Sequence, residues 1–147
     1  MALQRQLKLL RPEHEEAATM DDKGFRVAFA STDLKKVDQH FGSAERFAIY
    51  AGYDCDGITA AVFRHDLFTS LGHTNLTVHI PHRHYDGFGL SERGVRTLAK
   101  SKVDLIITVD CGTADLAAVE AAATHGIDVI ITDHHEPKGA LPPAVAV

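Results

Sequence analysis

The sequence predicts an α/β fold: a mostly parallel sheet flanked by helices. Two observations predict it. Short apolar, β-branched runs such as 103–109 alternate with longer segments of helical spacing, which is typical of sheets covered on both faces. Acidic side chains also follow three of the apolar runs directly. Because parallel strands bring their carboxyl ends to one edge, we expect that edge to carry the chemistry.

The expected elements follow from local patterns along the chain. Residues 1–24 are polar and charged, which is typical of a flexible arm. Ser91 is a helix-capping residue, and Gly72 and Gly126 are typical helix stops. The expected strands are 25–30, 46–50, 76–80, 103–109 and 128–132, and the expected helices are 57–71, 91–102 and 114–125.

Composition excludes several classes of protein. The 147 residues suit one domain, or one domain with part of another, and no apolar run approaches the roughly 20 residues that a membrane span needs. A net charge of −5 gives no basic surface for nucleic acid. No export signal is recognisable, and Cys55 and Cys111 each lie in an acidic motif instead of a disulfide framework. We expect a cytoplasmic protein with no membrane partner.

Three polar motifs follow predicted strands. Asp54 and Asp56 alternate in a glycine-flanked turn, Asp110 follows the run 103–109, and the adjacent His134 and His135 follow 128–132. Carboxylate and imidazole ligands suit Mn²⁺ or Mg²⁺, and clustered carboxylates repel one another without a cation between them. Each motif also has a simpler interpretation: a common turn, a helix cap or a surface pair. Together they favour a metal site.

Other polar residues give weaker signals. No base is fixed beside Cys55 or Cys111, so both are interpreted as small filling residues and not as nucleophiles. His79, His82 and His84 have the spacing of a possible ligand cluster, but a polar loop that faces the substrate is the favoured interpretation.

From about Phe47 to Val147 the chain resembles the DHH phosphoesterase family, most closely its single-strand-specific exonucleases of the RecJ type. The matching segments are Tyr53-Asp54-Cys55-Asp56-Gly57, Thr108-Val109-Asp110-Cys111-Gly112 and Thr132-Asp133-His134-His135, with a linking segment around 80–90. The resemblance implies metal-dependent hydrolysis that releases nucleotides from the 5′ end of single-stranded DNA.

The same resemblance implies roles for individual residues. Asp54, Asp56, Asp110 and His134 would be ligands of a Mn²⁺ (or Mg²⁺) pair. His135 would contact the scissile phosphate, and Asp133 would orient the motif; these two are the catalytic candidates. Arg83 and Gly112 would contact the substrate.

Two departures from the family pattern lower the expected activity. The family's first motif reads Gly-Asp-Tyr-Asp, whereas the chain has Ala51-Gly52-Tyr53-Asp54, so a carboxylate is missing at Gly52. The fourth motif, which supplies another aspartate, and the C-terminal substrate-binding domain are expected beyond Val147. We therefore expect a truncated domain with an incomplete two-metal site and weak or absent activity.

The first 50 residues carry a second resemblance. The segments 26–33 and 37–44 resemble the start of the NifX/NafY family, whose members bind the iron–molybdenum cofactor or its precursors. His40 would be the cofactor contact, although a plain loop histidine fits equally well. The alternative function is therefore a cofactor carrier that works with nitrogenase-maturation proteins. The expected organisation is an arm at 1–24, a partial NifX-like β segment at 25–50 and the N-terminal part of a DHH domain at 51–147.

Overall fold

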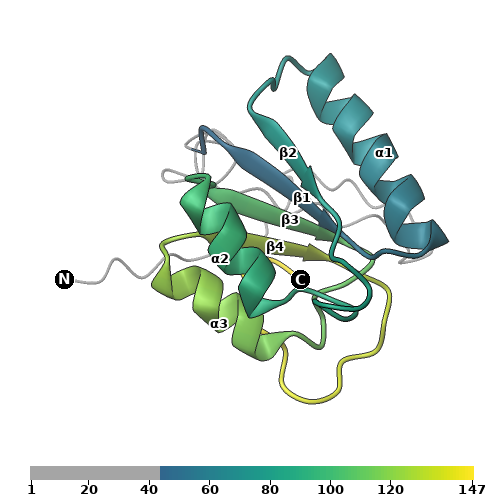
Figure 1. Cartoon of the computed structure of the whole chain (residues 1–147), viewed down its shortest axis with the longest axis vertical. Coiled ribbons are helices and arrows are strands. Elements are labelled where there is room, and N and C mark those ends of the chain that lie inside the picture. Colours follow the sequence, from purple (N-terminus) through teal and green to yellow (C-terminus); the bar gives the residue numbers. More distant parts are fainter. Residues whose placement is uncertain (1–43) are drawn as a thin grey trace, which may run out of the picture. The chain divides into compact units, whose positions relative to one another are not determined.

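The computed structural model describes residues 44–147, and these form a four-stranded parallel sheet in the order β2-β1-β3-β4 (Figure 1). The elements are β1 (Phe47–Ala51), α1 (Cys55–Ser70), β2 (Leu76–His79), α2 (Glu92–Lys100), β3 (Leu105–Val109), α3 (Leu116–Thr124) and β4 (Asp128–Thr132). The predicted parallel α/β fold is confirmed. The predicted arm at 1–24, the strand at 25–30 and His40 lie outside the described residues.

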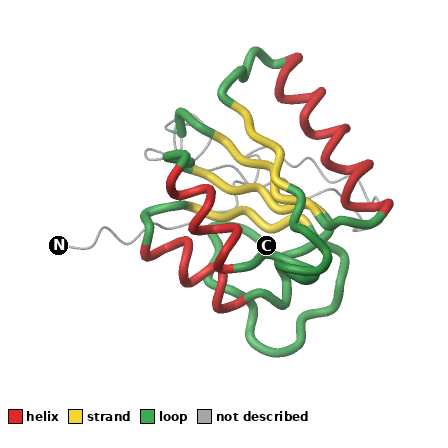
Figure 2. Tube along the Cα trace, in the orientation of Figure 1, coloured by secondary structure: helices red, strands yellow, loops and turns green. Residues whose placement is uncertain are grey.

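Helices cover both faces of the sheet because alternate residues of each strand point to opposite sides. On one face, Tyr50 of β1 and Ile106 of β3 pack in a buried cluster with Val95 and Leu98 of α2. On the other face, Phe47 of β1 stacks on Phe68 of α1, with ring centroids 6.3 Å apart. Figures 1 and 2 show α2 and α3 together on one side and α1 apart from them.

Side-chain caps mark the starts of helices α1 and α2. The Ser91 side chain accepts a hydrogen bond from the Gly94 N–H, so the predicted N-cap of α2 is confirmed. Helix α1 begins at Cys55, two residues before the predicted Gly57, because the Asp54 carboxylate caps it by accepting from the Gly57 N–H at 3.0 Å. Asp54, a predicted metal ligand, is therefore also the N-cap of α1.

Helix α1 turns an unexpected side toward the sheet. The large apolar residues whose spacing predicted it are exposed: Ile58 by 42%, Val62 by 57% and Leu71 by 64%. The buried residues are instead Gly57, Ala61 and Phe68. Small side chains allow a helix to lie close to a neighbouring backbone, so the spacing predicts the helix but not its buried side.

The strand register sets the position of the loops that follow the strands. Val109 at the end of β3 pairs with Ala51 on one side and with Thr132 on the other. The carboxyl ends of β1, β3 and β4 are therefore level, and the next residues of all three strands emerge at one edge. No helix of the described residues is long and apolar enough to cross a membrane.

Candidate metal centre

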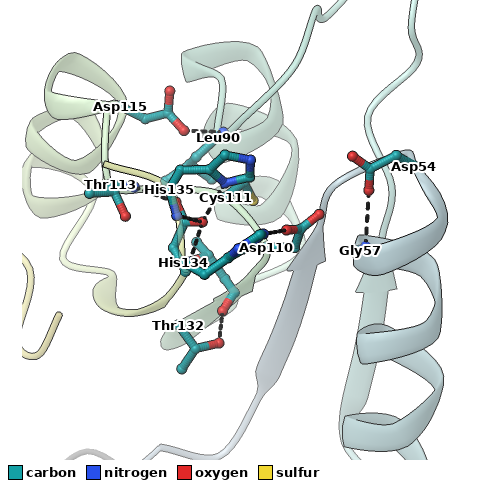
Figure 3. Close-up of polar contacts among 12 residues, drawn as sticks. Asp54, Gly57, Leu90, Asp110, Cys111, Thr113, Asp115, Thr132, His134 and His135 are labelled. Atoms are coloured by element: carbon teal, nitrogen blue, oxygen red, sulfur yellow. Dashed lines mark hydrogen bonds and ion pairs between the residues drawn. The ribbon is translucent and has the colours of Figure 1, made fainter. Parts of the chain in front are cut away.

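Backbone hydrogen bonds hold the three loops together where they leave the sheet. The Gly52 N–H donates to the Val109 carbonyl at 3.1 Å, and the Asp110 N–H donates to the Thr132 carbonyl at 2.9 Å. These hydrogen bonds extend the pairing of β1 with β3, and of β3 with β4, by one residue beyond the carboxyl ends of β1 and β3. The residues after them therefore share a common edge, which Figure 3 shows with Asp54, Asp110 and His134 around it.

Asp110 lies at the centre of this edge and is nearly buried. Its backbone has a φ of 60°, a left-handed conformation that is uncommon for residues other than glycine and that often marks a functional position. One carboxylate oxygen, Oδ1, lies 2.9 Å from His134 Nε2. The other, Oδ2, is buried and has no hydrogen-bond partner. A buried carboxylate oxygen without a donor is costly, and a cation would satisfy it.

Asp54 faces the same oxygen of Asp110. A Cβ atom added to Gly52 would lie 2.9 Å from Asp110 Oδ2 and 3.4 Å from Asp54 Oδ1, so the two carboxylates border the space above Gly52. Burial, the carboxylate of Asp54 and its negative charge raise the pKa of Asp110. The backbone hydrogen bond from Gly57 lowers the pKa of Asp54, with a further contribution from Asp110. The negative charge of Asp54 therefore disfavours that of Asp110, and a cation between them would relieve that repulsion.

Asp133 organises the third loop. Its Oδ1 accepts from the backbone N–H groups of His134 at 2.8 Å and His135 at 3.1 Å and lies 2.7 Å from His135 Nδ1. Its Oδ2 accepts from the Thr113 N–H at 3.0 Å. Burial opposes ionisation of Asp133, but the hydrogen bonds from Thr113 and His135 outweigh it and lower its pKa to about 2. The hydrogen bond to Asp133 raises the pKa of His135.

Replacing Asp133 by asparagine tests this organising role. The amide would turn an NH₂ group either toward the Thr113 N–H or toward the His134 and His135 N–H groups, leaving a buried donor without an acceptor. We expect the free energy of unfolding to fall by about 2 kcal/mol and the Mn²⁺ affinity by about tenfold or more. Urea unfolding and calorimetric Mn²⁺ titration measure these effects. Asp66→Asn, an exposed change beside His65, is the matched control and should leave both values unchanged.

The described residues offer one group with the geometry of a metal site. Ligand atoms of Asp110, His134 and His135 all lie within 4.8 Å of one another. Asp56, in the first turn of α1, does not belong to that group, but it lines the same hollow of about 430 Å³ as Asp110 and His134. The structure thus brings the predicted acidic and histidine residues to one edge, with Asp54 and Asp56 on the side of α1. The suggestion that Asp110 caps a helix is wrong, because the N-cap of α3 is Asp115.

A row of rings extends from this centre. The ring of His135 lies 5.6 Å from Phe88, and Phe88 lies 5.6 Å from Tyr53. The guanidinium of Arg83 stacks over Tyr53 at 4.5 Å. Arg83 is therefore adjacent to the centre although it lies in the loop between β2 and α2. Phe88 is about half exposed, so this row forms an accessible surface beside the candidate metal ligands.

Gly112 has a structural reason to be glycine. Its φ is 115°, and a Cβ atom there would lie 2.8 Å from Thr108 Oγ1 and 3.2 Å from the Ile131 side chain. It belongs to the turn that follows Asp110, where the Thr113 N–H binds Asp133. Its predicted substrate contact stays a prediction.

Some sequence interpretations change with the structure. Cys111 is buried, as expected of a filling residue, and burial raises the pKa of its thiol well above the usual range; Cys55 is exposed and fills no space. His79 stacks on Tyr50, whereas His82 lies beside His84 and Tyr85, and the described residues bring these three histidines into no group with the geometry of a metal site. Their favoured interpretation as a polar loop that faces the substrate stays a prediction. Sequence reasoning missed the half-exposed ring of Phe88 and Arg64, which lines the hollow.

The family model described as "DHH family, N-terminal domain" matches residues 46–147. The chain belongs to the DHH family. The matched residues include every strand and helix of the described sheet and all residues of the candidate centre, and the sequence resemblance to this family is confirmed.

Curated relatives of this DHH domain are single-stranded-DNA-specific exonucleases named RecJ. The Bacillus subtilis protein is 37% identical over 113 residues, the Escherichia coli protein 38% over 107 and the Thermus thermophilus protein 35% over 128. These matches cover 76%, 73% and 85% of this chain. The chain spans only 14%, 18% and 18% of the lengths of those relatives.

Solved structures give the same assignment. A crystal structure of exonuclease RecJ bound to manganese matches 69% of the chain and 26% of its own chain, with a TM-score of 0.63 and 33% identity. A crystal structure of RecJ from Thermus thermophilus in complex with Mn²⁺ matches 69% of the chain and 14% of its own chain, with a TM-score of 0.57 and 29% identity.

A different relative matches a short part of the chain. Protein NifX of Azotobacter vinelandii is 50% identical over 46 residues, which is 31% of this chain and 25% of that protein. This match supports the second sequence resemblance, although His40 lies outside the described residues.

Proposed function

We propose that the DHH domain hydrolyses phosphodiester bonds of single-stranded DNA from the 5′ end, with bound divalent metal. The observation that carries this proposal is the buried, unpartnered Asp110 Oδ2, which faces Asp54 and lies beside His134. A carboxylate in that position needs a cation, and the RecJ structures with the same fold contain manganese.

The residues present fit a Mn²⁺ or Mg²⁺ ion. Asp110 and His134 would hold it, with Asp54 and Asp56 contributing from the side of α1. Oxygen and imidazole donors suit these ions, and neither cysteine takes part in the cluster. When bound, the metal would supply the Lewis acid that polarises the phosphate and activates water.

Two residues of the chain itself, Asp133 and His135, would position the phosphate and stabilise its negative charge. Asp133 fixes the ring of His135 through Nδ1, which leaves Nε2 free to donate to a phosphate oxygen. Because Asp133 raises the pKa of His135, the imidazole holds its proton more readily near neutral pH. His135 would therefore stabilise the negative charge that develops on the phosphate.

The surface beside the centre supports single-stranded DNA as the substrate. Phe88, Tyr53 and Arg83 present rings and a stacked guanidinium, and unpaired bases stack on such groups regardless of sequence. The net charge of −5 gives little general attraction for the phosphates of a duplex. Binding would therefore depend on stacking and on the metal centre.

Release of labelled nucleotides tests the activity. We expect Mn²⁺-dependent release from 5′-labelled single strands and none from blunt duplexes. The rate should be low, because the position of Gly52 contributes no carboxylate to the space between Asp54 and Asp110. Asp110→Asn should abolish the release. Release that persists in chelator, or in Asp110→Asn, would contradict the proposal.

The match to NifX favours a second candidate function. In that case, the chain would carry the iron–molybdenum cofactor or a precursor through His40, together with nitrogenase-maturation proteins. Anaerobic mixing with isolated cofactor tests this alternative, and a spectral change that His40→Ala removes would support it. An unchanged cofactor spectrum in the wild type would count against it.

We also propose a cytoplasmic location and the three-part organisation of an arm at 1–24, a NifX-like segment at 25–50 and a DHH part at 51–147. The last two parts would share β1 (Phe47–Ala51), which pairs with β2 and β3 of the DHH sheet. The two free cysteines support a reducing compartment. Limited proteolysis tests the organisation: cleavage should fall before residue 44 and leave the described part intact.

A further inference from the structure

Arg64 is the cation among the side chains that line the hollow at the metal centre. The lining residues are Asp56, Ala60, Arg64, Val109, Asp110, Thr132, Asp133 and His134. Asp56, Ala60 and Arg64 are four residues apart on α1, so they share one side of that helix. The helix thereby presents a carboxylate at its first turn and a guanidinium further along the same side.

Arg64 forms no ion pair with a carboxylate of the described residues, although aspartates line the same hollow. Two other arginines of the described part have such partners: Arg96 lies 3.2 Å from Glu92, and Arg93 lies 3.6 Å from Asp86. Arg64 is only partly exposed, and its side chain lines the hollow. It is therefore available for an anion that enters the hollow.

The spacing along α1 separates Arg64 from the metal ligands. Eight residues of helix correspond to about 12 Å between the backbones of Asp56 and Arg64. Side chains of a helix lean toward its N-terminus, which brings the guanidinium toward Asp56 without reaching the ligand cluster. An anion held by Arg64 would thus lie next to an anion held at the metal centre and not coincide with it.

We propose that Arg64 binds a second phosphate group of the substrate, adjacent to the phosphate held at the metal centre. This inference rests on the proposed function, and it adds a subsite that selects ligands with two neighbouring phosphates. Arginine suits this task because its planar fork donates two parallel hydrogen bonds to phosphate oxygens.

Two nucleotide probes test the subsite without turnover. Thymidine 5′-monophosphate has one phosphate, and thymidine 3′,5′-bisphosphate has two, and neither contains a phosphodiester bond. Their dissociation constants are measured by calorimetry with the Mn²⁺-loaded full chain and with Arg64→Gln, Arg64→Lys and the control Arg96→Gln, a change on the surface of α2. Circular dichroism and Mn²⁺ affinity confirm that each variant is folded and loaded.

We expect the wild type to bind the bisphosphate more tightly than the monophosphate. Arg64→Gln should weaken bisphosphate binding by about tenfold and change monophosphate binding by less than about twofold. Arg64→Lys should recover part of the loss, and Arg96→Gln should match the wild type. Unchanged bisphosphate binding in Arg64→Gln, or an equal loss for both probes, would overturn the subsite. If the wild type binds neither probe, the proposed function fails and the subsite fails with it.

Discussion

Replacing His134 by alanine should lower the affinity for Mn²⁺ by at least about a hundredfold. His134 Nε2 lies 2.9 Å from Asp110 Oδ1, so its imidazole and that carboxylate point to the same space. Loss of residues that only support a metal ligand typically costs about 10- to 100-fold in affinity, and the loss of a ligand should cost at least as much. Calorimetry or the electron paramagnetic resonance of free Mn²⁺ measures the change.

The matched control is His125→Ala. His125 is an exposed histidine at the C-terminal end of α3, just before the strand that leads to the site, and it contacts no residue of the centre. Both changes remove one imidazole from the surface, so nonspecific binding of Mn²⁺ falls equally. If His134→Ala and His125→Ala bind Mn²⁺ alike, the assigned centre is not the binding site.

Replacing Gly57 by alanine should destabilise the domain by about 3 kcal/mol. A Cβ atom at residue 57 would lie 2.3 Å from the Gly52 carbonyl oxygen and 2.6 Å from the Gly52 carbonyl carbon. These are backbone atoms of the residue that follows β1. The Gly52 N–H is hydrogen-bonded to the Val109 carbonyl of β3, so this backbone cannot rotate away as a side chain can. Relief requires that α1 move from the sheet, and overpacking of this kind typically costs about 1–3 kcal/mol.

Urea unfolding compares Gly57→Ala with Gly139→Ala. A Cβ atom at Gly139 would meet no atom within 4 Å, so that variant should unfold within about 0.5 kcal/mol of the wild type. Equal midpoints for the two variants would contradict the close approach of α1 and β1. The Mn²⁺ affinity of Gly57→Ala should also fall, because Asp54 is held by the Gly57 N–H.

The sequence predicts the sheet better than the way in which α1 packs. The run 105–109 is buried at every position because both faces of β3 are covered, so its apolar residues clearly indicate a buried strand. In α1 the small residues Gly57 and Ala61 face the sheet, and the large residues Ile58 and Val62 do not. Spacing alone cannot distinguish these two sides, because both are apolar.

The candidate centre was also predictable only in part: the sequence indicates which residues follow the strands but not the conformation of their loops. Asp110 directly follows the buried strand β3, and His134 lies two residues beyond β4; parallel strands place such residues at one edge. The left-handed backbone of Asp110 and the several hydrogen bonds accepted by Asp133 depend on loop conformation and leave no periodic signal. Arg64 was missed because a single arginine on a helix resembles any other surface charge until the hollow is seen.

Because the ends of β1, β3 and β4 are level, the expected Mn²⁺ binding should depend on the correct alignment of these strands. Val109 sits opposite both Ala51 and Thr132, and a slip of one residue in any of these strands displaces its loop by about 3.3 Å and turns its side chains to the opposite face. The carboxylates and imidazole could then no longer meet. During refolding, recovery of tight Mn²⁺ binding would therefore report correctly aligned strands, whereas recovery of helical signal alone would not.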